Sequence, residues 1–315
     1  MLKAHAYLGG LTIIALAACS PGAPSIATAP PSRPAELALP PTYERTDVSF
    51  ALENYYSGVE RNLIVRGLLR DDGGGPDVSF GADDLKRAFN EIVFQQEFIR
   101  RGERLIRTEQ ESRLNRFSAP VRLNLVFGET VDDTRRDADR AEVGRLLRRL
   151  GRVSGHPIRQ VDDSDSANFT VFVVHEEERV NLEDRLRAAM PELTDQDITA
   201  ILDMPRTRYC LVVTSDPADD GQLERAIAIV RAEHSERLRV SCLHEEIAQG
   251  LGLQNDSPDA RPSIFTDEEE FGRLTSMDEL LLAMLYDPRL QPGMSAAEAE
   301  PILDQIITDL IGPRV

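Results

Sequence analysis

Alternating apolar and polar residues predict short strands separated by helices over most of the chain after residue 120. Val121–Phe127 alternates as a half-buried strand does, and Asn168–Val174 reads as a fully buried strand. Further strands are predicted at His156–Val161, Tyr209–Thr214 and Ala226–Arg231, and helices at Asp133–Arg149, Leu182–Met190, Thr194–Leu202 and Ala296–Ile311. Strands and helices are therefore interspersed along one chain.

Helix periodicity also appears at two further places. Apolar residues recur among charges over Asp84–Arg113, which predicts one long early helix. A later helix is expected to begin after Thr275 or Ser276 as the N-cap and to end at Asp287-Pro288.

The N-terminal 18 residues have the pattern of a signal peptide. Lys3 precedes an apolar stretch, and Leu16-Ala17-Ala18-Cys19 resembles the lipobox of bacterial lipoproteins. The resemblance implies cleavage before Cys19, acylation of this cysteine, and a periplasm-facing lipid anchor in the inner or outer membrane of the cell envelope. An ordinary secretory peptide with a chance cysteine is the alternative. Residues 19–42 then form a Pro/Ala-rich tether, and residues 43–315 a single domain with an N-terminal helical extension.

Net charge limits the classes of possible partner, and cysteine content predicts a disulfide. The formal net charge is −18, so nucleic acid and anionic lipid headgroups are repelled, and partners are expected to be neutral or basic. Once Cys19 is lipidated, Cys210 and Cys242 remain as a pair in an oxidising compartment, which predicts a disulfide between them. Two buried free thiols are the alternative.

Residues 242–256 have the spacing of a zinc-protease helix. The zinc proteases called zincins share a long sequence signature. It has the first metal ligand at relative position 0, the general base at 1, the second ligand at 4, a turn glycine at 7 and the third ligand at 10. With Glu245 at position 0, Glu246 takes the base position, Gln249 the second ligand, Gly252 the turn and Asn255 the third ligand. The three histidines of that signature are absent.

The replacements change the expected chemistry. Side chains at i and i+4 share one helix face, but a carboxylate and two amides suit zinc poorly. We therefore expect the helix geometry of a zinc-protease site without its catalytic zinc, with no metal and no cofactor. His244 and Asp256 are nearby polar residues. A register with His244 as first ligand fails, since Ala248 stands at the second-ligand position. The alternative is an ordinary amphipathic helix with a glycine C-cap.

Several segments together resemble a bacterial lipoprotein family known as domain of unknown function 2927. They are 242–256, 261–267, 269–271, 285–290 and 292–294, and the resemblance extends back through Phe169 and Cys210 to about Val121. It implies an α+β, zincin-like (metzincin-like) fold, with a mixed sheet packed against an active-site-type helix and a helical C-terminal part. Met277 resembles the methionine beneath the metal of such proteases; ordinary packing is the alternative.

Two functions follow as hypotheses. The first is a membrane-anchored envelope lipoprotein with a degenerate protease-like domain that binds a peptide or envelope polymer without catalysis. The second is an active hydrolase with a modified metal site, in which Glu246 is the general base. A purely structural envelope protein is the third possibility.

Overall fold

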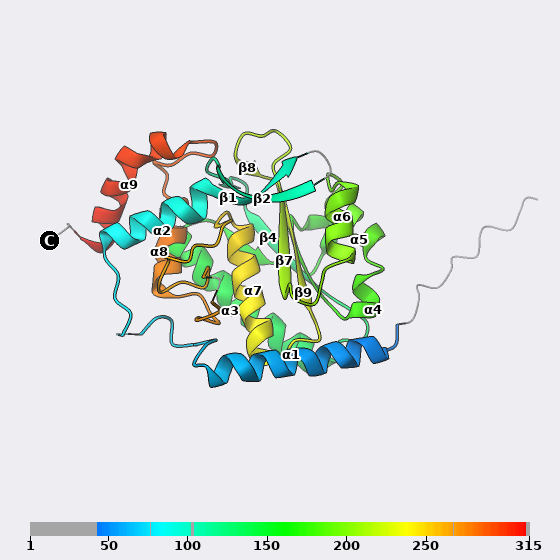
Figure 1. The fold of residues 1–315 in the computed structure, drawn as a ribbon. Helices are drawn as coiled ribbons and strands as arrows, with labels where there is room; N and C mark the ends of the chain where they lie inside the picture. The colour runs from blue at the N-terminus through cyan, green and yellow to red at the C-terminus, as the bar shows by residue number, and fades with distance from the viewer. Residues whose placement is uncertain (1–42, 76, 102–103, 267, 313–315) are drawn as a thin grey trace, which may run out of the picture. The chain divides into compact units, whose positions relative to one another are not determined.

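A five-stranded mixed sheet forms the centre of the fold in the computed structural model, which describes residues 43–75, 77–101, 104–266 and 268–312 (Figure 1). Its strands lie in the order β5 (Ile158–Gln160), β4 (Val121–Phe127), β6 (Phe169–Val174), β9 (Arg225–Arg231) and β7 (Cys210–Ser215). Neighbouring strands are parallel except β7, which runs antiparallel to β9. The predicted α+β class and the mixed sheet are confirmed.

Both faces of the sheet are buried, as the continuous apolar runs of its central strands require. In β9, Ala228 and Val230 belong to the main core, whereas Ile227 and Ile229 belong to a second core on the opposite face. The main core is shared with α3 (Asp133–Ser154), α7 (Glu236–Gly250) and α8 (Ser276–Leu285), and the second core with α5 (Glu183–Ala189) and α6 (Asp195–Leu202). Figure 1 shows these two groups of helices on either side of the sheet.

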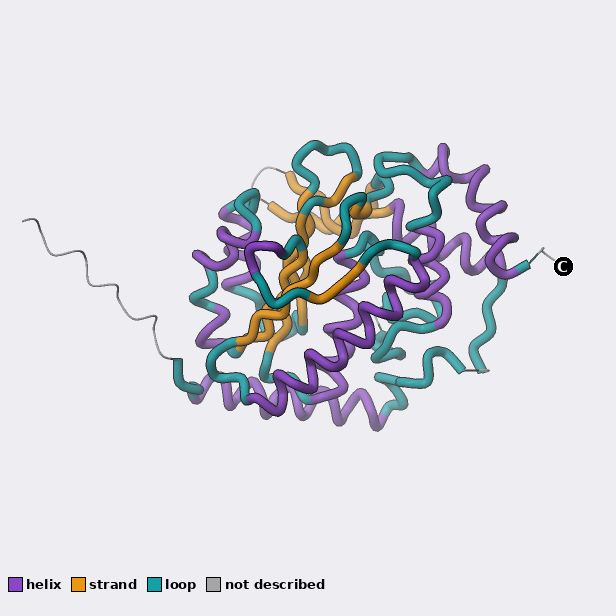
Figure 2. The backbone as a smooth tube through the Cα atoms, turned by 180° about the vertical axis from the view of Figure 1, so that it is seen from behind, coloured by secondary structure: helices purple, strands orange, loops and turns teal. Residues whose placement is uncertain are grey.

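Further elements complete the domain (Figure 2). They are α2 (Ala82–Phe94), the antiparallel pair β1 (Gln95–Arg101) and β2 (Arg104–Glu111), the parallel pair β3 (Arg116–Phe117) and β8 (Gln222–Leu223), the 3-10 turn Ser164–Ser166, α4 (Glu176–Arg179) and α9 (Ala296–Ile311). No helix of the described residues is both long and apolar enough to cross a membrane.

Helix α1 (Asp47–Val65) crosses the end of β9 and the start of α7 (Figure 1). The Ser49 hydroxyl donates to Glu233 at 3.0 Å, and the Tyr56 ring packs edge-on against His234 with 4.4 Å between ring centroids. Glu60 accepts a hydrogen bond at 2.9 Å from the backbone N–H of Leu238. A carboxylate from α1 therefore caps the N-terminus of α7, where unpaired N–H groups favour negative charge.

The predicted elements match the structure unevenly. β4 and α9 have the predicted bounds, and α8 begins after the predicted N-cap Thr275. The long helix predicted at Asp84–Arg113 is wrong, because α2 ends at Phe94 and the chain continues as the β1–β2 hairpin. The extended backbone of Gln95 ends α2, and cross-strand pairing then satisfies the backbone groups that a longer helix would have paired internally.

Candidate functional site

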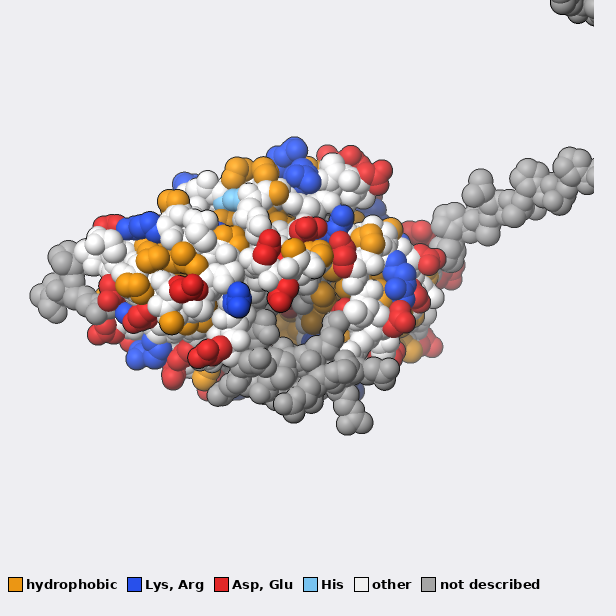
Figure 3. Space-filling model, turned by 90° about the horizontal axis from the view of Figure 1, so that it is seen from above, with side chains coloured by type: hydrophobic (Ala, Val, Ile, Leu, Met, Phe, Trp, Pro, Cys, Tyr) orange, Lys and Arg blue, Asp and Glu red, His pale blue; other side chains and the backbone are white. Residues whose placement is uncertain are grey.

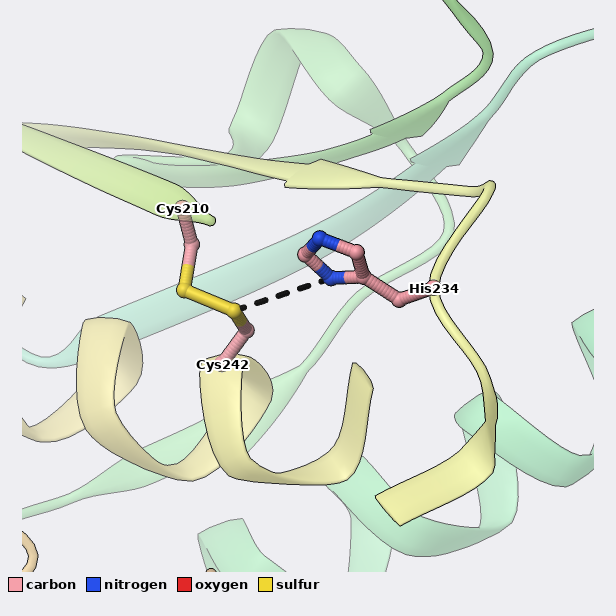
Figure 4. Close-up of a disulfide and its surroundings, with 3 residues drawn as sticks. All are labelled: Cys210, His234 and Cys242. Atoms are coloured by element: carbon pink, nitrogen blue, oxygen red, sulfur yellow. Dashed lines mark hydrogen bonds between the residues drawn. A yellow bond between two sulfur atoms is a disulfide. The ribbon is translucent and has the colours of Figure 1, made fainter. Parts of the chain in front are cut away.

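A disulfide joins α7, the helix that carries Glu245 and Glu246, to the edge of the sheet. Cys210 in β7 and Cys242 in α7 are bonded with 5.8 Å between their Cα atoms, so the predicted disulfide is confirmed. Figure 4 shows the His234 ring pointing at this bond, with Nδ1 3.8 Å from Sγ of Cys242. Burial, together with Arg231, Arg239 and Arg135, holds the pKa of His234 well below its usual value, so the ring is neutral. The bond fixes α7 against the edge strand.

A pocket of about 520 Å³ opens beside this disulfide. Its buried floor comes from α7, with Leu238, Ser241, Cys242 and Glu246; its half-buried or apolar walls are Leu63, Tyr209, Cys210, Glu245 and Glu269; its exposed rim is Arg66, Thr207 and Glu268. Four glutamates and one arginine line it. Figure 3 shows acidic and basic side chains interspersed over one face of the molecule.

Two polar atoms at the floor of the pocket have no hydrogen-bond partner. Ser241 is 1% exposed and Glu246 4% exposed, yet neither Oγ of Ser241 nor Oε2 of Glu246 is hydrogen-bonded. Buried polar atoms are nearly always paired, so two unpaired atoms in one pocket mark it as a candidate binding site.

Burial and nearby negative charges raise the pKa values of three glutamates of the pocket, Glu245, Glu246 and Glu269. The pKa of Glu245 is well above its usual value because of burial and then of the charges on Glu269, Glu246 and Asp256. The pKa of Glu246 is raised well above normal by burial and then by Asp256, against a smaller opposing effect of Arg208. Burial and Asp256 raise the pKa of Glu269 to about 7. Negative charge in this pocket is therefore poorly compensated.

The wall that carries Glu269 is held in an uncommon backbone conformation. Glu269 has a φ of 56° and Leu69 a φ of 53°, both in the left-handed region that non-glycine residues rarely adopt. The backbone N–H of Leu69 donates to the carbonyl of Glu269 at 2.8 Å, and that of Arg70 to Glu270 at 2.9 Å. The segment after α1 thus fixes Glu269 in the wall of the pocket.

The other predicted ligand positions point elsewhere. The side-chain amide of Gln249 donates to Asp256 at 3.1 Å, and that of Asn255 donates to the backbone carbonyl of Glu91 in α2 at 3.0 Å. Neither residue lines the pocket that Glu245 and Glu246 share. This donor set does not fit zinc, since its amides are used in structural hydrogen bonds; within the described residues, no three His, Cys, Asp or Glu side chains are grouped to hold a metal ion.

His244 lies on the far side of α7 from the pocket. Its Nδ1 accepts from the backbone N–H of Leu274 at 3.2 Å, so the proton is on Nε2, which donates to Glu142 at 2.9 Å. Burial lowers the pKa of His244 despite this carboxylate. Met277 is fully buried in the main core at the start of α8. His244 therefore connects α7 to α3 and to the backbone just before α8, and Met277 packs α8 into the main core.

Gly252 stands where only glycine fits. Its φ is +122°, and a Cβ atom there would lie 2.2 Å from the carbonyl oxygen of Asn115. The glycine therefore lets the chain turn back after α7 at close contact with another backbone segment.

Only part of the pocket is marked by a signal in the sequence. Ser241 lies four residues before Glu245, a spacing that places both on one helix face, so this residue was detectable. Leu63, Arg66 and Tyr209 come from distant elements and carried no local signal. Cys19 lies outside the described residues.

Fold and pocket define an α+β domain with an acidic pocket between its central helix and the edge strand of its sheet. The chain belongs to the family described as Protein of unknown function (DUF2927), whose model matches residues 82–305. The match begins earlier than the resemblance seen from about Val121, at the first residue of α2. Searches of curated proteins and of solved structures gave no match.

Proposed function

We propose that this protein is a lipid-anchored component of the bacterial cell envelope, attached through Cys19, and that its pocket binds a peptide or a peptide-bearing envelope polymer without cutting it. The observation that carries the proposal is the unpaired Oε2 of buried Glu246 at the floor of the pocket. This acceptor is one that a group of a bound peptide could pair with, and pairing a buried polar atom is favourable.

The position of α7 after β9 supports a protease-derived scaffold as part of this proposal. α7 follows β9 directly and packs against β9 and β7, as the resemblance to zincin catalytic domains predicts for an active-site helix. Gln249 and Asn255 occupy ligand positions but bond to Asp256 and to α2. A metal-bound water is what such proteases use as nucleophile, and these residues do not assemble that site.

The edge strand makes a peptide a suitable ligand. β7 pairs only with β9 among the described strands, and Tyr209 and Cys210 at its start line the pocket. An extended peptide can add to such an edge through main-chain hydrogen bonds while one of its side chains enters an adjacent pocket.

Binding without cleavage can be tested on one peptide mixture. The full chain, immobilised from detergent, is incubated with a chymotryptic digest of casein, and the retained and free peptides are compared by mass spectrometry. We expect retention of a subset of peptides and no new cleavage products. Retention of none, or new cleavage products, contradicts the proposal. Glu236→Gln, at the exposed start of α7, is the matched control variant.

A second candidate function is hydrolysis with Glu246 as general base. It is favoured by the raised pKa of this carboxyl group in a pocket, which is typical of catalytic acids and bases. Cleavage products that form with added Zn²⁺ or Mg²⁺ and disappear in Glu246→Gln, but not in Glu236→Gln, would establish this function.

A further inference from the structure

We infer that the floor of the pocket receives a primary ammonium group on an aliphatic stem, such as the side chain of a lysine in a bound peptide. This inference rests on the proposed peptide binding and names the chemical group that the pocket selects. The two unpaired atoms at the floor, Ser241 Oγ and Glu246 Oε2, are its starting point.

The oxygens around the floor match the donors of an ammonium group. Ser241 and Glu245 lie at i and i+4 on one face of α7, and Glu246 follows directly. Three side chains thus offer oxygens from different directions over about one helical turn. An ammonium group has three donors on freely rotating bonds, whereas a guanidinium needs two acceptors in its own plane. Separate oxygens in different directions therefore favour the ammonium.

Charge around the floor favours a cation over a neutral group. Glu245, Glu246 and Glu269 line the pocket, and Glu268 stands at its rim. Arg66, the one arginine that lines it, lies at the exposed rim, and Arg208 opposes the repulsion felt by Glu246 without lining the pocket. The raised pKa of Glu246 reflects the cost of its buried carboxylate without a partner, so an entering cation would favour loss of the proton and form an ion pair with the carboxylate.

Apolar walls accommodate the stem of such a ligand. Leu63 and Leu238 are buried, and Tyr209 and the Cys210–Cys242 disulfide complete this side of the pocket. Lysine side chains bury their methylene stems against apolar surface while their charged end reaches polar groups. The pocket therefore offers apolar contacts along its depth and oxygens at its floor.

Defined probes test the inference on the full chain in detergent at pH 7.5. Nα-acetyl-lysine-N-methylamide is titrated by calorimetry, with its Nε-acetylated form and the arginine analogue as comparisons. We expect the lysine probe to bind at least tenfold more tightly than either comparison. Binding of the Nε-acetylated probe with equal affinity, or of the arginine probe with equal or higher affinity, overturns the inference, as does binding of Ca²⁺ where the lysine probe does not bind.

Variants locate the binding in the pocket. Glu246→Gln is expected to weaken binding of the lysine probe at least tenfold and Ser241→Ala a few-fold, while Glu236→Gln leaves it unchanged. Thermal melts check folding; Ser241→Ala leaves no buried charge and removes an unpaired hydroxyl, so its fold is expected to be retained. Unchanged binding in both pocket variants overturns the inference.

The casein digest separates this inference from the proposed function. Treating the digest with an acetylating reagent blocks its lysine side chains and N-termini. Retention of the untreated peptides with loss of the acetylated ones supports the inference. Equal retention of both pools overturns the ammonium group while peptide binding stands, and retention of neither pool overturns peptide binding itself.

Discussion

Removal of the Cys210–Cys242 disulfide is expected to lower the free energy of unfolding by about 4 kcal/mol. The bonded residues are 32 positions apart. In the chain-entropy model, closing a loop of that length removes roughly 12 cal/mol/K from the unfolded chain, which is about 4 kcal/mol at 25 °C. The same loss corresponds to a fall in Tm of roughly 10 °C for a domain of this size.

The variant should remove the bond and add nothing else. Cys242 is only 2% exposed, so serine would bury a new hydroxyl, whereas Cys210→Ala/Cys242→Ala leaves an apolar methyl group at each position. β7 pairs on one side only among the described strands, so the loss of protection against amide exchange is expected first in this strand.

Urea unfolding of the full chain in detergent, followed by circular dichroism, measures the effect. Wild-type protein treated with a phosphine reductant is the control, and it should reproduce most of the loss. If oxidation of the wild type is established by mass spectrometry and the double variant loses less than about 1 kcal/mol, the loop-entropy reasoning fails.

Three further predictions concern the helix ends and the pocket. Gly252→Ala is expected to lower the free energy of unfolding by at least about 3 kcal/mol, because it combines a φ of +122° with a Cβ 2.2 Å from the Asn115 oxygen. The control Gly155→Ala, with a φ of +65° and open space around it, should lower it by about 1 kcal/mol. Equal losses in urea unfolding would contradict this prediction. Glu60→Ala should cost about 1 kcal/mol by uncapping α7, and no loss at 25 °C would show that the Leu238 N–H finds another partner. The folded state raises the pKa of Glu246, so it keeps a proton that the unfolded chain loses above about pH 4.5, and the stability of the wild type falls as pH rises. The stability of Glu246→Gln relative to wild type should therefore increase between pH 5 and pH 8. Urea midpoints that change in parallel for the two proteins would refute this.

Local patterns in the sequence predicted the elements whose stability is decided locally. β4 at Val121–Phe127 alternates on two faces with different burial, and α9 at Ala296–Ile311 is bounded by the N-cap Ser295 and by Gly312. Gly252 was expected to form a turn. A glycine is required there because the backbone of Asn115 lies too close for a Cβ atom. These signals lie within a few residues of the feature they specify.

Predictions failed where distant partners decide the conformation. The helix predicted over Asp84–Arg113 ends at Phe94, because the following residues pair with one another as strands. α7 begins at Glu236, ahead of the predicted motif, and its first turn is capped by Glu60 of α1. A capping residue almost 180 positions away leaves no trace in the local pattern.

The candidate site also has some features that local sequence predicts and others that depend on distant segments. The class of fold, the cysteine pair and the presence of Glu245 and Glu246 on one helix could be predicted from the chain, since periodicity, composition and spacing are local properties. The partners of Gln249 and Asn255, and the pocket that Ser241 shares with the glutamates, follow from how distant segments pack together. The reason is physical: burial and charge repulsion act through space, and they arise only when α1, β7 and the segment with Glu269 close around α7.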